Sequence, residues 1–484
     1  MYIGIDLGST NIKAAVYDCE MRLLERRSVP VTYLRDDGKV EFDAQTYFDA
    51  LCVLVKELVS DKKCDDVRQI AFTGQAETLV CVGEDGQPLM NAISWMDERS
   101  VEECAELAKR FPADLCERIT GQQAVLPTWP ATKILWLRHH APSIFEKTAC
   151  FMLLKDYIVY RLTGKKTADM SIATFSFYFD IYRKHYWKDM LDAIGIDESR
   201  LPSLVEPCGV AGKLTQEAAE RLGLSRDVDV NVGTLDHFAG MIGTGNVAQG
   251  GVTLSTGTVM ALAVMAQSPA PRNSGIAMHY GFLPDTHVML PVAESGGASL
   301  EWFHSNCMAG ISYDEMNRVL AERGGNSLLF LPYLVGINAP EFDSDAVGAF
   351  WGLRQGHDVY DMAHAVMEGV AFMLRKNIEA IRQKGVRVDH IIATGGGAKS
   401  PVWCRLQANI TGLRVVIPKE KEAACLGAAM VAAVADGRFA DYADAAQHCV
   451  SMVTRYEPHP SAFLETKYRR FTLLYQACIQ AARI

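Results

Sequence analysis

The first part of the chain shows two patterns of apolar and polar positions, one typical of β-strands and one typical of α-helices. Residues 2–18 comprise an apolar strand, a Gly-Ser-Thr turn and a second, alternating strand, which predicts a β-hairpin with hydroxyl groups at its tip. Residues 42–61 then show apolar side chains at helical spacing, with Asp43 as the predicted N-cap. Residues 68–75 return to a strand that ends in a polar turn, so strands and helices alternate.

The hairpin pattern occurs again in the middle of the chain. Residues 251–264 form an apolar strand, a Ser-Thr-Gly-Thr turn and a second apolar strand. Just before them, residues 230–251 predict a strand, a short helix and a turn dense in glycine. A chain of 484 residues exceeds what one core usually supports. We therefore expect two related domains, residues 1–246 and 247–484.

Two patterns in the second half add to this picture. Residues 361–374 place apolar side chains on one helical stripe, which predicts an amphipathic helix that packs on a core. Residues 389–410 read as a strand, a triple-glycine turn and a helix. A strand that leads through glycine backbone into a helix N-terminus commonly binds a phosphate or a nucleotide.

Composition excludes several classes of function. The net charge of −10 argues against a surface for nucleic acid or anionic membranes, because those partners require clustered Lys and Arg. The 13 cysteines contain no Cys-x-x-Cys pair, which favours a reducing compartment over a disulfide framework. The sequence shows neither a secretory pattern nor a long apolar stretch, so we expect a cytoplasmic protein.

The first hairpin tip carries groups suited to phosphate chemistry. Phosphoryl transfer requires donors around the phosphates, a divalent metal and a carboxylate that accepts the hydroxyl proton. Here Asp6 could hold a metal ion through water, Thr10 could donate to phosphate oxygens and Lys13 could neutralise their charge. The alternative is an ordinary hairpin turn with solvated hydroxyls. The matching turn at residues 255–258 makes the functional interpretation stronger.

Asp236 is the candidate catalytic base. It lies between Gly233 and Gly240, whose small size lets the backbone bring a carboxylate to the floor of a cleft. The alternative is an N-cap of the short helix that follows, a role compatible with catalysis. His237 is either a substrate contact or a partly buried histidine bonded to its neighbours.

Several blocks in order resemble the FGGY carbohydrate kinases over essentially the whole chain. Residues 348–353 followed by 361–368 match the C-terminal signature of that family, and residues 130–137 match its N-terminal signature. Thr128 and His139 depart from the residue types usual at two positions of the N-terminal pattern. Further similar blocks are residues 95–99, 154–157, 330–334 and 422–429. The resemblance implies an α/β fold of two actin-like (ribonuclease H-like) ATPase domains with a nucleotide cleft between them.

The resemblance also implies a role for each candidate residue. Asp236 is the general base, and Asp6 and Asp236 together would hold Mg²⁺. The substrate contacts would be Gln75, Glu77, Trp95, Asp97 and His237. The contacts to the ATP co-substrate would be Thr10, Lys13, Thr256, Gly257, Gly297, Glu301, Gly396, Gly397 and Ala398.

The substrate segment at residues 74–78 departs from the patterns of two subfamilies. It reads Gly-Gln-Ala-Glu-Thr, where xylulose kinases typically show Gly-Gln-Met-His and glycerol kinases Gln-Arg-Glu-Thr. Residues 95–99 and 330–336 look more like those of pentulose kinases. The expected activity is therefore ATP-dependent phosphorylation of a ketose hydroxyl, with a pentulose such as xylulose as the first candidate. A polyol kinase of the glycerol or erythritol type is the alternative.

Two other classes of protein share this fold. One is a catalytically silent actin-like sugar sensor, which the presence of Asp236 and both phosphate turns argues against. The other is a chaperone-like ATPase, which would have no use for the FGGY blocks. The expected partner is a small sugar or polyol, with no nucleic acid and no membrane. Resemblance to xylulose kinases implies a homodimer, whereas glycerol-kinase relatives can be tetramers.

Overall fold

The computed structural model describes residues 1–60, 66–266, 270–293 and 295–482. The chain divides into two compact units. Unit 1 comprises Met1–Val247, Ala277–Val288 and Glu422–Val450, and unit 2 comprises Ala248–Ile276, Met289–Lys421 and Ser451–Ile484. No helix in the described ranges combines the length and apolar character that a membrane span requires.

Unit 1 is built on a six-stranded sheet in the order β14-β15-β6-β1-β2-β3. β1 pairs antiparallel with β2 and parallel with β6, and β15 pairs parallel with β6. The expected hairpin and the strand that follows the first long helix are confirmed. The strands are β1 Tyr2–Leu7, β2 Asn11–Tyr17, β3 Leu23–Pro30, β6 Gln69–Gly74, β14 Val210–Lys213 and β15 Asp229–Asn231.

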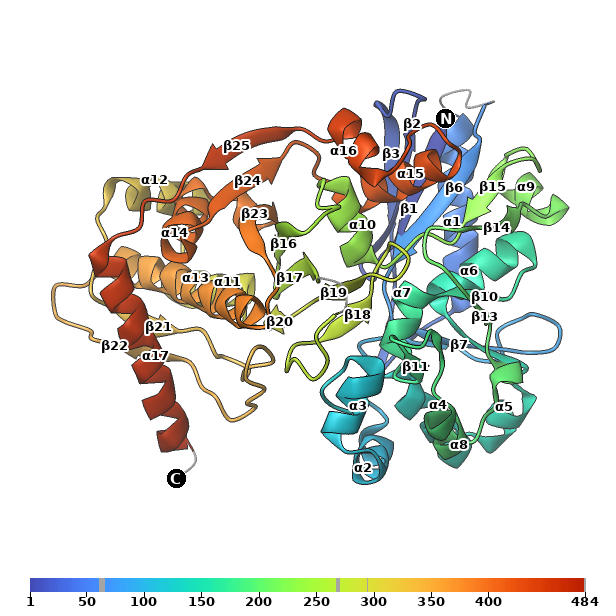
Figure 1. The fold of residues 1–484 in the computed structure, drawn as a ribbon, viewed down its shortest axis with the longest axis horizontal. Helices are drawn as coiled ribbons and strands as arrows, with labels where there is room; N and C mark the ends of the chain where they lie inside the picture. Colours follow the sequence, from blue (N-terminus) through green and yellow to red (C-terminus); the bar gives the residue numbers. More distant parts are fainter. Residues whose placement is uncertain (61–65, 267–269, 294, 483–484) are drawn as a thin grey trace. The chain divides into compact units, whose positions relative to one another are not determined.

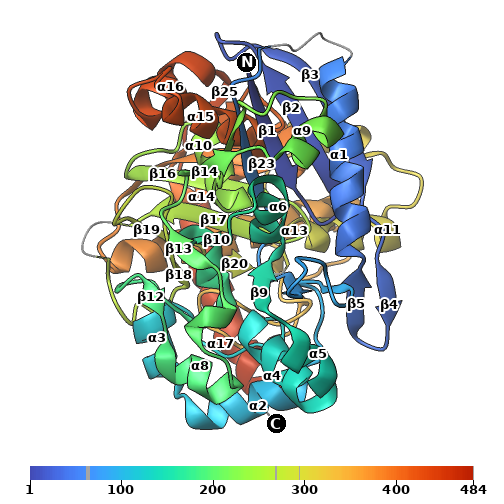
Figure 2. The ribbon, with the colours of Figure 1, turned by 90° about the vertical axis from the view of Figure 1, so that its right-hand side faces the viewer.

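The two faces of this sheet carry different helices. On one face, β1 directs Ile3, Ile5 and Leu7 into a core shared with α1 Ala44–Ser60, α6 Leu154–Thr163 and α9 Gln216–Leu222. Asp43 caps α1 as predicted, because its carboxylate accepts the N–H of Thr46 at 2.5 Å. Figure 2 shows α1 alongside β2 and β3.

The other face of the sheet packs against a helix from much later in the chain. α15 (Ala423–Ala435) lies so close to β1 that a Cβ at Gly4 would be 2.0 Å from the carbonyl oxygen of Cys425. α10 (Asp236–Gly243) packs on α15 just as tightly, since a Cβ at Gly427 would lie 1.8 Å from the Ala239 oxygen. Figure 1 shows the red helix α15 beside the blue strand β1.

A second core in unit 1 is formed by smaller elements. A five-stranded sheet runs in the order β4-β5-β8-β7-β9. Its strands are β4 Leu34–Asp36, β5 Lys39–Phe42, β7 Leu79–Val82, β8 Ala92–Ile93 and β9 Cys150–Leu153. The helices are α2 Val101–Arg110, α3 Ala113–Thr120, α4 Pro130–His140, α5 Pro142–Lys147 and α8 Lys188–Ile194.

Short elements complete unit 1. They are β10 Thr167–Asp169, α7 Met170–Ala173, η1 Thr174–Ser176, β11 Phe179–Asp180, β12 His185–Tyr186, η2 Glu198–Arg200, β13 Ser203–Val205, β18 Met278–Tyr280 and α16 Tyr442–Cys449. β19 His287–Met289 ends at the boundary of the two units.

Unit 2 has a sheet of the same kind, with its strands in the order β17-β16-β23-β24-β25. β16 pairs antiparallel with β17, as the second hairpin predicts, and parallel with β23. The same three-strand pattern surrounds β1 in unit 1, so the expectation of two related halves agrees with the topology. The strands are β16 Gly250–Thr256, β17 Met260–Met265, β20 Val292–Ala293, β21 Leu329–Leu331, β22 Ala349–Trp351, β23 Val388–Gly395, β24 Arg414–Pro418 and β25 Met452–Tyr456.

The predicted helix at residues 361–374 lies within α13 (Val359–Gln383) and is buried on more than the predicted stripe, with His364 and Glu368 also inside. The strand, glycine turn and helix predicted at 389–410 are confirmed as β23, η3 Gly397–Lys399 and α14 Pro401–Thr411. The remaining helices of unit 2 are α11 Gly297–Cys307, α12 Tyr313–Glu322 and α17 Ala462–Ala482.

Candidate active site

A cavity of about 350 Å³ opens in unit 1 beside the end of β1. It brings together eight of the residues predicted from the sequence, from four separate segments of the chain. They are Asp6, Thr10, Lys13, Gln75, Glu77, Trp95, Asp236 and His237. Gly8, Ser9, Asn11, Ala76, Phe175 and Leu235 complete the lining.

Asp6 and Lys13 are directly opposite each other in the β1–β2 register. Burial, with the charge of Asp236 as the next contribution, raises the pKa of Asp6 to about 7. The Lys13 ammonium donates to Oε2 of Glu422 at 2.7 Å, and this bond and charge outweigh burial and raise the pKa of Lys13. Three carboxylates, those of Asp6, Glu77 and Asp236, thus line the cavity, and the ammonium of Lys13 in the same lining is already paired with Glu422. This arrangement favours a bound cation.

The backbone before Asp236 makes a turn that requires glycine. Gly233 has φ +66°, and a Cβ there would lie 1.5 Å from the carbonyl oxygen of Phe72. The chain then enters α10 with Leu235 as N-cap, so Asp236 is the first helical residue and not the N-cap of the alternative interpretation. Its Oδ1 accepts the N–H of His237 at 2.6 Å. A carboxylate at a helix N-terminus is stabilised in its charged form by the helix dipole.

A buried polar network lies under this turn. The Ser171 hydroxyl lies 2.9 Å from the Thr234 hydroxyl, accepts the N–H of Leu235 at 3.1 Å and donates to Asp169. Asp169 is ion-paired with Lys155, which also donates to the Val232 carbonyl at 2.6 Å. The network therefore ties the backbone on both sides of Gly233 to buried side chains.

Glu77 occupies an unusual backbone conformation at the cavity wall. Its φ is +63°, which is uncommon for a residue with a side chain and is found mostly where function or packing imposes it. Burial raises the pKa of Glu77 to about 7, although Lys133 lowers it. Lys133 is itself buried and donates to the carbonyls of Ser94 at 2.8 Å and Glu77 at 3.3 Å. Burial lowers the pKa of Lys133 to about 8.

Trp95 lies at the mouth of the cavity with 40% of its surface exposed. The Thr78 hydroxyl connects it to Gln75, since it accepts the Trp95 N–H at 3.1 Å and donates to Gln75 Oε1 at 2.8 Å. Gln75 Nε2 in turn donates to the Gly8 carbonyl at 3.3 Å. Both ends of the Gln75 amide are therefore engaged with the protein.

The structure does not bring Asp97 to the cavity with the other predicted substrate residues. Its carboxylate is fully buried and accepts the Val40 N–H at 2.5 Å and the Arg99 guanidinium at 2.6 Å. These protein donors satisfy its oxygens. Asp97 therefore orders the loop that carries Trp95, and its direct substrate contact stays a prediction.

Aromatic rings line the cavity near His237. Phe175 stacks on His279 with ring centroids 4.4 Å apart, and Gln122 Nε2 lies 3.3 Å from Nδ1 of His279. Burial, with a contribution from His237, lowers the pKa of His279 to about 3, so this imidazole is neutral. The rings give this wall an apolar surface.

A second cavity of about 390 Å³ lies within unit 2. Six residues predicted for ATP line it: Thr256, Gly257, Gly297, Glu301, Gly396 and Gly397. Ala398 does not line it and lies in the turn between two lining residues, Gly397 and Lys399, so its predicted contact is not supported by the geometry. Leu300, Met316 and Trp403 add apolar surface.

The glycines of this second cavity allow backbone segments from different elements to lie in close contact. A Cβ at Gly297 would lie 2.3 Å from the Gly257 oxygen, and the Gly297 N–H donates to that oxygen at 2.8 Å. A Cβ at Gly397 would lie 2.8 Å from Cβ of Thr256. The end of β16 thus sits directly against the N-terminus of α11 and the turn before α14. Backbone N–H groups in such glycine turns suit phosphate groups.

Comparison with known proteins agrees with this geometry. The profile of the FGGY family of carbohydrate kinases, N-terminal domain, matches residues 1–243, and that of the C-terminal domain matches residues 252–435. The chain belongs to the FGGY family of carbohydrate kinases. The expected two-domain actin-like (ribonuclease H-like) α/β fold is confirmed, as is the expected class of enzyme, a phosphotransferase with an alcohol acceptor.

Individual FGGY kinases resemble this chain over nearly its whole length. The xylulose kinase of Bacillus subtilis is 30% identical over 482 residues, which cover 98% of this chain and 95% of that protein. The solved structure of a ligand-bound xylulose kinase from Lactobacillus acidophilus has 26% identity and a TM-score of 0.91, covering 99% of this chain and 98% of that one. A gluconate kinase from the same organism also has 26% identity and a TM-score of 0.91, covering 99% and 97%.

Some site residues of this FGGY kinase are not evident from its sequence. Phe175 follows a segment without a family block, and only folding places it in the cavity. Ser171 and Asp169 likewise lie far from Asp236 in sequence. Lys133 belongs to the N-terminal signature block, and this position could have identified it as a residue of the site.

Proposed function

We propose that this FGGY kinase transfers the γ-phosphoryl group of ATP to a hydroxyl of a ketose, with a pentulose such as xylulose as its substrate. The observation that carries the proposal is the unit 1 cavity, whose lining includes Asp236, Glu77 and Trp95. Its volume of about 350 Å³ fits a small sugar. The relatives named xylulose kinase support a pentulose over other acceptors.

Asp236 is the proposed general base. A carboxylate at the first position of a helix, held by a rigid turn, can accept a proton from a sugar hydroxyl as that oxygen attacks phosphorus. Asp236 lies in the first turn of α10, where the helix dipole interacts favourably with a negatively charged side chain. The network of Ser171, Asp169 and Lys155 fixes the backbone that carries it.

Asp6 and Asp236 are the proposed residues that hold Mg²⁺, directly or through water. The raised pKa of Asp6 supports this proposal, because a cation beside both carboxylates would relieve the repulsion that contributes to it. When bound, Mg²⁺ supplies charge neutralisation to phosphate oxygens. Thr10 and Lys13, on the same hairpin, are the proposed donors to the phosphates.

The unit 2 cavity is the proposed site for the nucleotide. Gly257, Gly297, Gly396 and Gly397 have no side chain that would block the close approach of phosphate groups, and Thr256 adds a hydroxyl. The apolar side chains of the same cavity would pack against the adenine ring. Glu301, on α11, is the proposed polar contact.

The substrate contacts proposed in unit 1 are Glu77, Trp95, His237 and Gln75. Glu77 accepts hydrogen bonds from sugar hydroxyls, and Trp95 packs against the carbon skeleton. Ala76 leaves space where glycerol and xylulose kinases carry larger side chains, so the cavity accepts a substrate bulkier than glycerol. Asp97 acts through the loop that it orders.

A substrate screen tests this proposal. ADP release is measured by a coupled assay with pentuloses, hexuloses, sugar acids, glycerol and tetritols as acceptors at saturating ATP and Mg²⁺. We expect the highest kcat/KM for a pentulose. A sugar acid or glycerol as the best acceptor would overturn the proposed substrate, and no sugar-dependent ADP release with any acceptor would overturn the proposed activity.

We also propose that the enzyme is a cytoplasmic homodimer. Both statements rest on the resemblance to xylulose kinases and on the role of such kinases in metabolism. Light scattering coupled to size-exclusion chromatography measures the mass of the particle, which is compared with the 53.3 kDa of one chain.

A further inference from the structure

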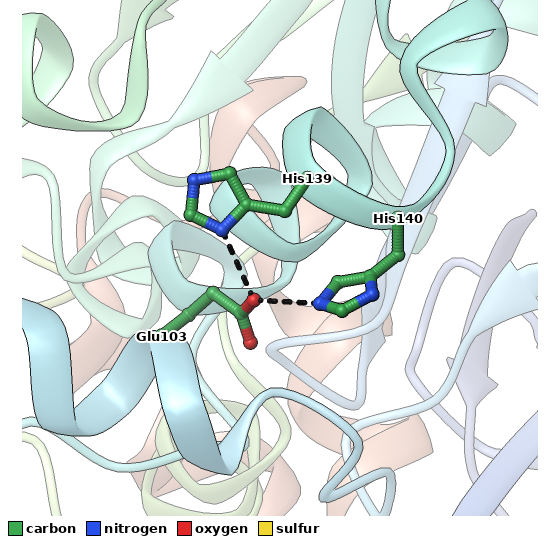
Figure 3. Close-up of side chains that lie close together, drawn as sticks. All are labelled: Glu103, His139 and His140. Carbon is green, nitrogen blue, oxygen red and sulfur yellow. Dashed lines mark hydrogen bonds and ion pairs between the residues drawn. The ribbon is translucent and has the colours of Figure 1, made fainter.

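Three potential metal ligands converge in unit 1 outside both cavities. Glu103 comes from α2, while His139 and His140 are the last two residues of α4 (Figure 3). Oε1 of Glu103 lies 3.2 Å from Nδ1 of His139 and 3.1 Å from Nε2 of His140. One ligand atom from each residue lies within 4.8 Å of the other two.

The burial of these side chains gives the cluster a floor and an open side. The Glu103 side chain is only 2% exposed, whereas the imidazoles of His139 and His140 are 40% and 46% exposed. Oε2 of Glu103 is buried and has no hydrogen-bond partner in the part of the chain that the structure describes. A buried carboxylate oxygen without a donor is costly, so the site has capacity for a cation.

The ring of His140 is held in place by its own helix. Trp136, one turn earlier on α4, stacks on it with ring centroids 5.1 Å apart and planes at 19°. The Arg99 guanidinium covers Trp136, 4.9 Å from a ring centroid. Nε2 of His140 is therefore directed at Glu103 by packing, which reduces the entropy lost when a ligand binds.

We propose that Glu103, His139 and His140 form a binding site for a divalent transition-metal ion of the Zn²⁺, Ni²⁺ or Cu²⁺ type. Two imidazole nitrogens and one carboxylate oxygen suit such ions, with water completing the coordination. Two ligands about 2.0–2.1 Å from one ion lie about 2.9–3.4 Å apart at tetrahedral to right angles. The observed oxygen–nitrogen separations of 3.1 and 3.2 Å fall in this range. The ion would join α2 to the end of α4.

The proposal has one competing explanation. Each imidazole can instead donate an N–H to Glu103, which makes a hydrogen-bonded cluster that needs no ion. The two explanations differ in their response to added metal. The transition-metal site also differs from the proposed Mg²⁺ site at Asp6 and Asp236, because Mg²⁺ prefers oxygen ligands.

Calorimetric titration with ZnCl₂ of the full chain, freed of metal by EDTA, tests the site. We expect a saturable Zn²⁺ site in the wild type that excess Mg²⁺ does not occupy. His139→Ala, His140→Ala and the isosteric Glu103→Gln should each weaken it by more than about tenfold, since even outer partners of metal ligands contribute that much. His448→Ala is the matched control, because it removes an exposed imidazole paired with a single carboxylate, that of Asp444 at 3.2 Å.

A melting experiment provides a second measurement. Zn²⁺ should raise the Tm of the wild type and of His448→Ala, but not that of the other three variants, because ligands that bind the folded state stabilise it. Equal Zn²⁺ binding in wild type and His139→Ala/His140→Ala would place the ion elsewhere, for example at the exposed thiols of Cys19 and Cys307. Either that result or the absence of saturable binding would overturn the proposal in favour of the hydrogen-bonded cluster.

Discussion

The backbone N–H of Leu235 donates to the Ser171 hydroxyl at 3.1 Å, which fixes the residue directly before Asp236. Ser171→Ala removes this acceptor and the contact with Thr234. We expect turnover to fall by about ten- to a hundredfold, because small displacements of a catalytic group are costly, while KM for the sugar changes less. Steady-state kinetics at saturating ATP measure both.

Ser176→Ala is the matched control for this prediction. Its buried hydroxyl donates to the Ala173 carbonyl at 2.6 Å, within the same region but away from the Asp236 turn. Ser171→Ala removes three hydrogen bonds of a buried hydroxyl and Ser176→Ala removes two, so both variants should lose stability, by about 1–3 kcal/mol. If both lose turnover equally, Ser171 has no particular role in positioning the base.

Asp236→Asn keeps the size of the side chain and removes its basicity. We expect ATP and sugar to bind as before and turnover to fall by a factor of about 10²–10⁴, the usual contribution of acid–base catalysis. Single-turnover kinetics together with calorimetric sugar binding check this. Turnover near that of the wild type would remove Asp236 from the mechanism.

Glu77 should give the reaction a pH dependence near neutrality. With its pKa raised to about 7 from 4.5, the folded protein holds a proton there that the unfolded chain has lost. The free energy of unfolding therefore falls as the pH rises from 4.5 to about 7. Over the same range Glu77 loses its proton, so its carboxylate becomes a better acceptor of hydrogen bonds. We expect kcat/KM for the sugar to rise with pH around 7 and this rise to be smaller in Glu77→Gln.

The difference between the two pH profiles isolates Glu77. Asp6 also has a pKa of about 7 and contributes to both profiles alike. Charge-assisted hydrogen bonds contribute about 1.5–3 kcal/mol, so Glu77→Ala should lower kcat/KM for the sugar by about 10- to 150-fold at pH 8. An unchanged sugar profile in Glu77→Ala would show that Glu77 makes no substrate contact.

Lys13→Ala and Thr256→Val test the phosphate contacts, each within its own unit. Both remove donors from positions where charge grows in the transition state, so KM for ATP should rise and turnover should fall. Glu422→Gln is the companion variant, because it weakens the ion pair that holds the Lys13 ammonium. Loss of sugar binding with ATP kinetics intact would contradict these assignments.

Local patterns in the sequence predicted much of the fold. Both hairpins follow from alternation and a hydroxyl-rich turn, and α1 follows from helical spacing after Asp43. The burial of α13 was underestimated, because the polar side chains of His364 and Glu368 lie inside the protein, with Nδ1 of His364 3.3 Å from Oε2 of Glu368. A sequence shows charge but not the partner that permits its burial.

The candidate site was predictable where the residues lie on strand ends and turns. Asp6, Glu77 and Asp236 belong to such segments and meet in one cavity. Asp97 does not line that cavity, and spacing along the chain does not reveal that its carboxylate turns back to Arg99 and Val40. The support from Ser171 was not predictable either, since it depends on long-range packing.

Protein synthesis proceeds from the N-terminus, and α15 emerges from a ribosome long after β1, the strand that it covers. Until residues 422–450 have been made, the face of β1 that contains Gly4 has no helix from its own unit to cover it, although residues 1–247 are complete. A sheet face left without its covering helix for that time is a binding surface for chaperones and for other nascent chains. Unit 1 therefore reaches its final form only after residues 422–450 have been made, and a chain truncated before residue 422 would expose this face permanently.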